Sequence, residues 1–146
     1  MPQAMLLDDL QAFFTAYAQA IREGDPGTIL RFFAMPLTRA TTARQTLLED
    51  EEAAEAAVEA LRARLEANGI ANARLATIEL GAVGEDAADV NVHWELLDED
   101  DVPVIAYDVG YSLTRTGTHN WRIVSIREDE QNRAFADAGW TGRDAA

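Results

Sequence analysis

The stretch YAQAIREGDPGTILRFF, residues 17–33, joins two amphipathic segments by a break at Gly24. Apolar residues at three- and four-residue steps predict a helix over residues 6–23, which the glycine ends. Asp25 suits the cap of a second helix and Pro26 suits its first position. The pattern predicts that this second helix runs to the end of the stretch.

The next part of the chain predicts two short strands and a third helix. The strands are expected over residues 35–42 and 45–48. The helix is expected over residues 49–67, because the acidic residues 49–52 form its first turn and Asn68 and Gly69 follow its end. Its apolar stripe consists of Ala54, Ala57, Val58, Leu61 and Leu65.

The second half of the chain reads as strands separated by short polar turns. Strands are predicted over residues 74–83, 89–97, 102–115 and 121–127, with a short helix over 131–138. Consecutive strands with short connections pair antiparallel. The fold class is therefore α+β: three N-terminal helices packed into a curved, mainly antiparallel sheet. We expect one domain over residues 1–146, with a core at about 6–128 and a tail at 129–146.

The charge balance argues against nucleic-acid and membrane partners. The net charge is −14, from 26 acidic and 12 basic residues, and every basic residue is arginine. Such a surface repels phosphate backbones and anionic membranes. No apolar run approaches the ~20 residues of a membrane span, and residues 1–9 contain no basic segment followed by an apolar one. We therefore expect a cytoplasmic protein.

The residue types also limit the chemistry. There is no cysteine, which excludes disulfides, thiolate catalysis and cysteine-ligated metals. His93 and His119 are far apart and form no paired ligand motif. The acidic run at residues 98–101 lacks the spacing of a calcium loop. We expect no metal and no cofactor.

Three features together resemble the nuclear transport factor 2-like superfamily, which includes SnoaL-like and ketosteroid isomerase-like proteins. They are residues 17–25, the second helix with Phe32 and Phe33, and the closing strand from Trp121 to Ile126, in this order. The resemblance covers about residues 6–128 and suggests a bacterial member. It implies a cone with an apolar pocket at one end and, as in many members, a homodimer through the outer sheet face. Members include isomerases, dehydratases, cyclases and binding domains, so the fold leaves the function open.

Tyr17 matches the tyrosine that donates to the substrate oxygen in ketosteroid isomerases. The position of the general base in those enzymes falls on Thr41 here, and that of the second acid falls near Val109. Asp108 is one residue away, which on a strand means the opposite face. Because a threonine is no base at neutral pH, we do not expect ketosteroid isomerase activity.

Alternation along the strands predicts which side chains face the pocket. In residues 90–96 the apolar residues alternate with Asn91, His93 and Glu95, which places His93 on the outer face. The last strand is partly apolar on both faces, which fits a dimer. The predicted ligand pocket consists of Phe14, Tyr17, Phe33, Trp94, Tyr111 and Ile126.

Four side chains are candidates for polar chemistry. Tyr17, Asp108 and His93 are candidate catalytic residues. Asp108 lies among apolar neighbours and needs a partner, for which Arg122 or Arg74 is available. Arg39 reads either as a surface arginine or as a clamp for a carboxylate at the mouth of the cone.

Three functions fit these observations. The first is a domain that binds a small apolar molecule in the pocket. The second is an enzyme of the cyclase, dehydratase or isomerase kind acting on a small carbonyl compound, with Tyr17 polarising the carbonyl and Asp108 or His93 moving a proton. The third is a dimeric interaction module that uses the outer sheet face.

Overall fold

The structure is a computed structural model that describes residues 3–117 and 120–140. His119 lies outside these residues. The elements in chain order are α1 Gln3–Glu23, α2 Pro26–Leu30, β1 Phe33–Ala40, β2 Gln45–Leu48, α3 Glu51–Ala67, β3 Asn72–Val83, β4 Ala87–Leu97, β5 Pro103–Arg115, β6 Trp121–Arg127 and α4 Asp129–Asp137. The predicted α+β class and the predicted strands of the second half are confirmed.

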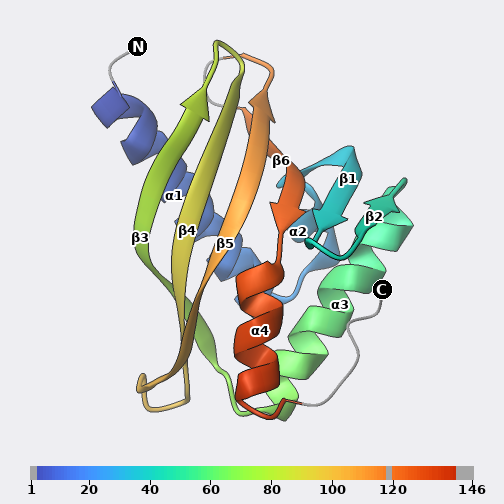
Figure 1. The fold of residues 1–146 in the computed structure, drawn as a ribbon, viewed down its shortest axis with the longest axis vertical. Coiled ribbons are helices and arrows are strands. Elements are labelled where there is room, and N and C mark those ends of the chain that lie inside the picture. Colours follow the sequence, from blue (N-terminus) through green and yellow to red (C-terminus); the bar gives the residue numbers. More distant parts are fainter. Residues whose placement is uncertain (1–2, 118–119, 141–146) are drawn as a thin grey trace.

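The sheet has six strands in the order β2-β1-β6-β5-β4-β3. All neighbours pair antiparallel except β1 and β6, which pair parallel. The long strands β3, β4 and β5 lie side by side, with α1 running behind them, while β1 and β2 form the opposite edge (Figure 1). This arrangement confirms a mainly antiparallel sheet, with one parallel pair that brings the first strand beside the last.

The helix α1 and the concave face of the sheet form the core. Leu10 and Phe14 of α1 are fully buried. The ring of Phe14 lies 4.7 Å from the ring of Tyr111 and 6.4 Å from that of Trp94, measured between centroids. Aromatic rings at these separations pack edge to face or tilted against each other. The contacts therefore join the first helix to two central strands.

The second helix is shorter than its sequence pattern predicts. It ends at Leu30, and Phe33 begins β1 instead of closing the helix. The reason is pairing with β6, since the backbone N–H of Ile123 donates to the carbonyl of Phe32 and Phe33 lies opposite Ile123. Pro36 lies within β1, where the pairing with β6 is irregular and a missing N–H is tolerated.

The segment after β6 is part of the fold rather than a loose tail. Residues 129–137 form α4, close to the short helix predicted there. Phe135 is fully buried, with its ring 5.4 Å from Tyr107 and 4.8 Å from Trp140. In Figure 1, α4 lies next to α3 beyond the end of β6. The core therefore extends to Trp140, and α4 closes the end of the cone.

Candidate functional site

A cavity of about 100 Å³ lies between α1, α3 and the concave face of the sheet. The apolar stripe predicted for α3 forms one wall, and Ala18 and Ile21 of α1 form another. The lining comprises Tyr17, Ala18, Ile21, Phe33, Leu37, Arg39, Leu48, Ala54, Ala57, Val58, Ala60, Leu61, Arg64, Leu65, Ala73, Trp94, Leu96, Tyr107, Tyr111, Ile126, Glu128 and Gln131. A concave, mainly apolar site with a few polar groups is the usual form of a small-molecule site.

Aromatic side chains from α1, β4 and β5 form the floor of the cavity. Trp94 and Tyr111 lie on adjacent strands, and the indole Nε1–H donates to the Tyr111 hydroxyl at 3.0 Å. The ring of Tyr17 lies 6.4 Å from that of Tyr111 and 5.8 Å from that of Phe33. The hydrogen bond and the ring contacts hold these side chains in fixed positions.

The three tyrosines of the floor stay protonated at neutral pH. Burial raises the pKa of Tyr17, the negative charge of Glu128 raises it further, and the positive charge of Arg39 partly offsets this. Burial also raises the pKa of Tyr107 and of Tyr111, with smaller contributions from Tyr17 and Glu128. Each hydroxyl can therefore donate a hydrogen bond to a ligand oxygen but cannot act as a base.

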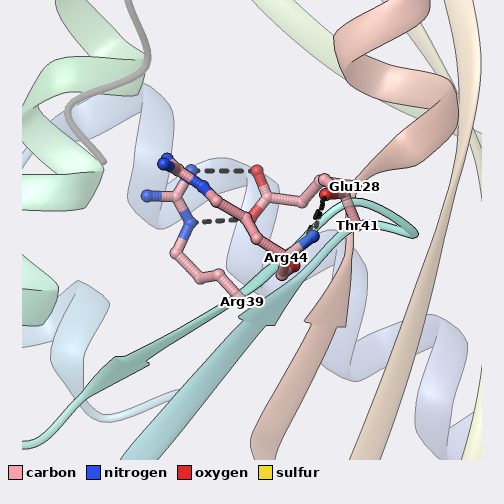
Figure 2. Close-up of polar contacts among 4 residues, drawn as sticks. All are labelled: Arg39, Thr41, Arg44 and Glu128. Carbon is pink, nitrogen blue, oxygen red and sulfur yellow. Dashed lines mark hydrogen bonds and ion pairs between the residues drawn. The ribbon is translucent and has the colours of Figure 1, made fainter.

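Arg39 and Glu128 form a two-pronged ion pair in the wall of the cavity (Figure 2). The Arg39 Nε–H donates to Oε1 of Glu128 at 2.6 Å and Nη2 donates to Oε2 at 2.9 Å. Only 13% of the Arg39 side chain and 6% of the Glu128 side chain are exposed. Planar, bidentate contacts of this kind are among the strongest hydrogen bonds in proteins.

Strand pairing explains why these two residues meet. Arg39 lies near the end of β1 opposite Ile126, and the backbone N–H of Glu128 donates to the carbonyl of Ala40 at 2.9 Å. Beside the pair, the β1–β2 turn is closed by the N–H of Thr41, which donates to the carbonyl of Arg44 (Figure 2). The parallel pairing of β1 and β6 thus brings both side chains to the same end of the sheet.

Arg64 is the second arginine in the lining, and it comes from α3. Its guanidinium lies over the ring of Phe135, 4.8 Å from the centroid, and Nη2 donates to the carbonyl of Trp140 at 3.4 Å. Its Nε atom is buried and has no hydrogen-bond partner within residues 3–117 and 120–140. The cavity therefore contains a cation whose hydrogen bonding is incomplete.

A second hollow adjoins the cavity between α1, α3 and the start of β3. It has a volume of about 260 Å³ and is lined in part by Arg22, Arg62 and Asn72. Four of its lining residues, Ala18, Ile21, Leu65 and Ala73, also line the cavity.

Five of the six residues predicted for the pocket line the cavity. They are Tyr17, Phe33, Trp94, Tyr111 and Ile126. Phe14 does not line the cavity, because its side chain packs between α1 and the rings of Trp94 and Tyr111. Ligand binding by the other five stays a prediction.

His93 and Asp108 lie on the outer face of the sheet, away from the cavity. His93 faces outward as the alternation predicts, opposite Asp108 on β5, and its Nδ1 lies 2.7 Å from Oδ1 of that aspartate. The partners proposed for Asp108 were wrong, since Arg74 pairs with Glu95 and Arg122 donates to the carbonyl of Arg31. Neither His93 nor Asp108 can reach a ligand in the cavity.

Four polar residues of the cavity lining were not predicted: Arg64, Tyr107, Glu128 and Gln131. Tyr107 lies on the same strand face as Tyr111, so the alternation along β5 could have found it. Arg64 follows Leu61 by three residues, which places it on the lining face of α3. Glu128 directly follows the last strand and shows no pattern in the sequence. Thr41, the position of an isomerase base, does not line the cavity.

Residues 3–117 and 120–140 contain neither a metal-binding cluster nor a membrane-spanning helix. No group of three or more histidine, aspartate and glutamate side chains is arranged to hold a metal ion in this part of the chain. None of the helices there has the length and apolar character needed to cross a membrane.

Comparison with known proteins places the chain in a family. A family model described as NTF2-like protein (DUF6841) matches residues 8–131. No curated protein matches the sequence.

Solved structures share the fold at low sequence identity. Aln2 from a Streptomyces species has a TM-score of 0.69 at 13% identity, over 94% of this chain and 98% of that one. A protein from Catenulispora acidiphila, in complex with S-DNPA, has a TM-score of 0.65 at 17% identity, over 91% and 98%. An NTF2-like protein of unknown function from Shewanella oneidensis has a TM-score of 0.61 at 18% identity, over 82% and 95%. From the family match over most of its length and from the shared fold, the chain belongs to the NTF2-like family DUF6841.

Proposed function

We propose that the protein binds a small, mainly apolar molecule in the cavity between α1, α3 and the sheet. The observation that carries this proposal is the composition of the lining, in which aliphatic residues of α1 and α3 face an aromatic floor. Few polar groups converge there, and they are held in place by hydrogen bonds, as in sites that fix the orientation of a ligand. The complex of the Catenulispora acidiphila protein with S-DNPA supports the use of this fold to hold a ligand.

The volume of the cavity limits the size of the ligand. A cavity of about 150 Å³ with apolar walls holds benzene, and the cavity here is about 100 Å³. The part of the ligand that enters is therefore no larger than about one aromatic ring or a short branched chain. A larger ligand would extend into the adjoining hollow between α1, α3 and β3.

The test is a thermal-shift screen with neutral ring compounds, small ketones and short polyketide-like molecules. A ligand at about a hundred times its dissociation constant adds about 2.7 kcal/mol to the free energy of unfolding, which raises the midpoint by several degrees. Ala57→Phe, which points a ring into the cavity, should abolish the rise.

Ala56→Phe is the matched control, because Ala56 is the exposed neighbour on the same helix and does not line the cavity. This variant should respond to ligand as the unmodified protein does. If no compound raises the midpoint, or if both variants respond equally, the proposal is wrong.

A second candidate is an enzyme acting on a small carbonyl compound. One observation favours it: the cavity contains both the protonated hydroxyl of Tyr17 and the carboxylate of Glu128. In this mechanism Tyr17 polarises the carbonyl and Glu128, in place of Asp108 or His93, receives the proton. NMR spectroscopy of each binding compound after incubation tests this, because it detects isomerisation as well as loss of water. Turnover that Tyr17→Phe abolishes would establish the enzyme, and unchanged compounds would leave binding alone.

A further inference from the structure

We propose that Arg64 is an anion-binding group, so that the molecule in the cavity carries a carboxylate on its apolar body. This inference rests on the proposed function, because it identifies the chemical class of the ligand. It begins with the charges of the lining. Arg39 and Arg64 are the arginines of the cavity, and Glu128 is its carboxylate.

The two arginines differ in their surroundings. Both carboxylate oxygens of Glu128 are engaged by Arg39. Arg64 forms no ion pair with any carboxylate in the part of the chain that the structure describes, and its buried Nε–H lacks an acceptor there. Arg64 lines the cavity, and only one donor of its guanidinium, at Nη2, is used within this part of the chain, by the carbonyl of Trp140, so donors remain for an anion in the cavity.

Within the described residues, Arg122 and Arg127 also lack a carboxylate partner, since they donate to the carbonyl of Arg31 and to the hydroxyl of Ser112. What distinguishes Arg64 is its place in the cavity lining. Acidic residues outnumber basic ones by 26 to 12. In a protein so rich in carboxylates, an arginine that faces a cavity without one is suited to a carboxylate brought by a ligand.

Arg64 is also held in position before any ligand binds. The ring of Phe135 supports the face of the guanidinium and the carbonyl of Trp140 accepts from Nη2. A positioned guanidinium loses little freedom on binding, and its planar donors match the two oxygens of a carboxylate. The apolar walls and the aromatic floor would then hold a small ring or branched chain.

The test uses benzoate as the anionic probe and benzyl alcohol as its neutral counterpart, with binding measured by calorimetry on the full chain. Benzoate should bind at least about tenfold more tightly, as expected for a hydrogen bond to a charged group. Arg64→Gln should remove this preference, so that benzoate and benzyl alcohol bind with about equal affinity. Arg133→Gln, which removes an exposed arginine of α4, should leave the preference intact.

The outcomes separate this inference from the proposed function. Equal affinity for the two probes in the unmodified protein, or a preference that survives Arg64→Gln, overturns the role of Arg64 but leaves binding in the cavity in place. Absence of binding for both probes overturns both proposals. Equal affinity of the two probes for the unmodified protein overturns the role of Arg64 even if the Arg64 variant does not fold.

Discussion

Arg39 and Glu128 are 89 residues apart in the sequence, yet they form a bidentate ion pair in the wall of the cavity, with Nε–Oε1 and Nη2–Oε2 distances of 2.6 and 2.9 Å. The pair joins the first strand to the segment that leads into α4. It also supplies charges beside the aromatic floor, where Glu128 raises the pKa of Tyr17 and Arg39 lowers it. Its loss should therefore affect both stability and the cavity.

Glu128→Gln is expected to lower the free energy of unfolding by about 3 kcal/mol or more, because Arg39 loses its bidentate charged partner at a buried site. The double variant Arg39→Met with Glu128→Leu should lower the free energy of unfolding by less than the sum of the losses caused by Arg39→Met alone and Glu128→Leu alone. Urea unfolding measures both. The control is Glu130→Gln, which breaks an exposed pair with Arg133 and should cost less than about 1 kcal/mol. A buried pair that costs no more than this exposed one would contradict the expectation.

Gly24→Ala is expected to destabilise the protein more than Gly69→Ala. Both glycines have a positive φ, 78° and 76°, so alanine is strained by about 1 kcal/mol at either position. At Gly24 the new Cβ would also collide with the guanidinium of Arg62, whereas nothing lies within 4 Å at Gly69. If Arg62 moves to relieve this contact, the hydrogen bond from its Nε–H to the carbonyl of Ile21 is weakened or lost.

Thermal unfolding of both glycine variants, each with and without Arg62→Ala, measures how much the contact between position 24 and Arg62 contributes to the loss of stability. In the Arg62→Ala background the two glycine substitutions should cost about the same. A difference that persists without the arginine would show that the Gly24–Arg62 contact is not its cause.

Tyr111→Phe is expected to cost about 1–3 kcal/mol, because it leaves the buried Nε1–H of Trp94 without an acceptor. Tyr107→Phe is the comparison, since the Tyr107 hydroxyl forms no hydrogen bond to a residue of the described chain and should be lost at little cost. Chemical denaturation followed by circular dichroism gives both values. Equal costs for the two substitutions would mean that the Trp94–Tyr111 hydrogen bond contributes nothing measurable.

Alkaline titration of the folded protein should detect no ionisation of its tyrosines near pH 10. The chain has three, Tyr17, Tyr107 and Tyr111, and burial raises the pKa of each above the ordinary value of 10.0. Above pH 10 the unfolded chain loses these protons first, so stability is intact below pH 10 and falls as pH rises. The slope should approach about 1.4 kcal/mol per tyrosine per pH unit.

Absorbance at 295 nm follows the ionisation, and unfolding curves at several alkaline pH values follow the stability. Phenolate absorbance should appear only together with unfolding. A tyrosine that ionises near pH 10 while the protein stays folded would show that its hydroxyl is open to solvent.

The sequence by itself determined most of the elements and the faces of the central strands. Helical periodicity in residues 6–23 and in α3, and the alternation around Trp94, depend only on local spacing, because a helix or strand turns its side chains at a constant angle. The sequence was therefore sufficient for the α+β class, for the wall that α3 contributes, and for the outward direction of His93.

Only the tertiary structure decided which polar side chains meet. Glu128 follows the last strand with no periodic signal, and it reaches Arg39 because β1 pairs parallel with β6. Asp108 meets His93 rather than an arginine because the β4–β5 register places the two residues opposite each other. Phe14 is on the predicted face of α1 but fills the core behind the cavity. Contacts between distant segments depend on strand order and register, which local spacing does not encode.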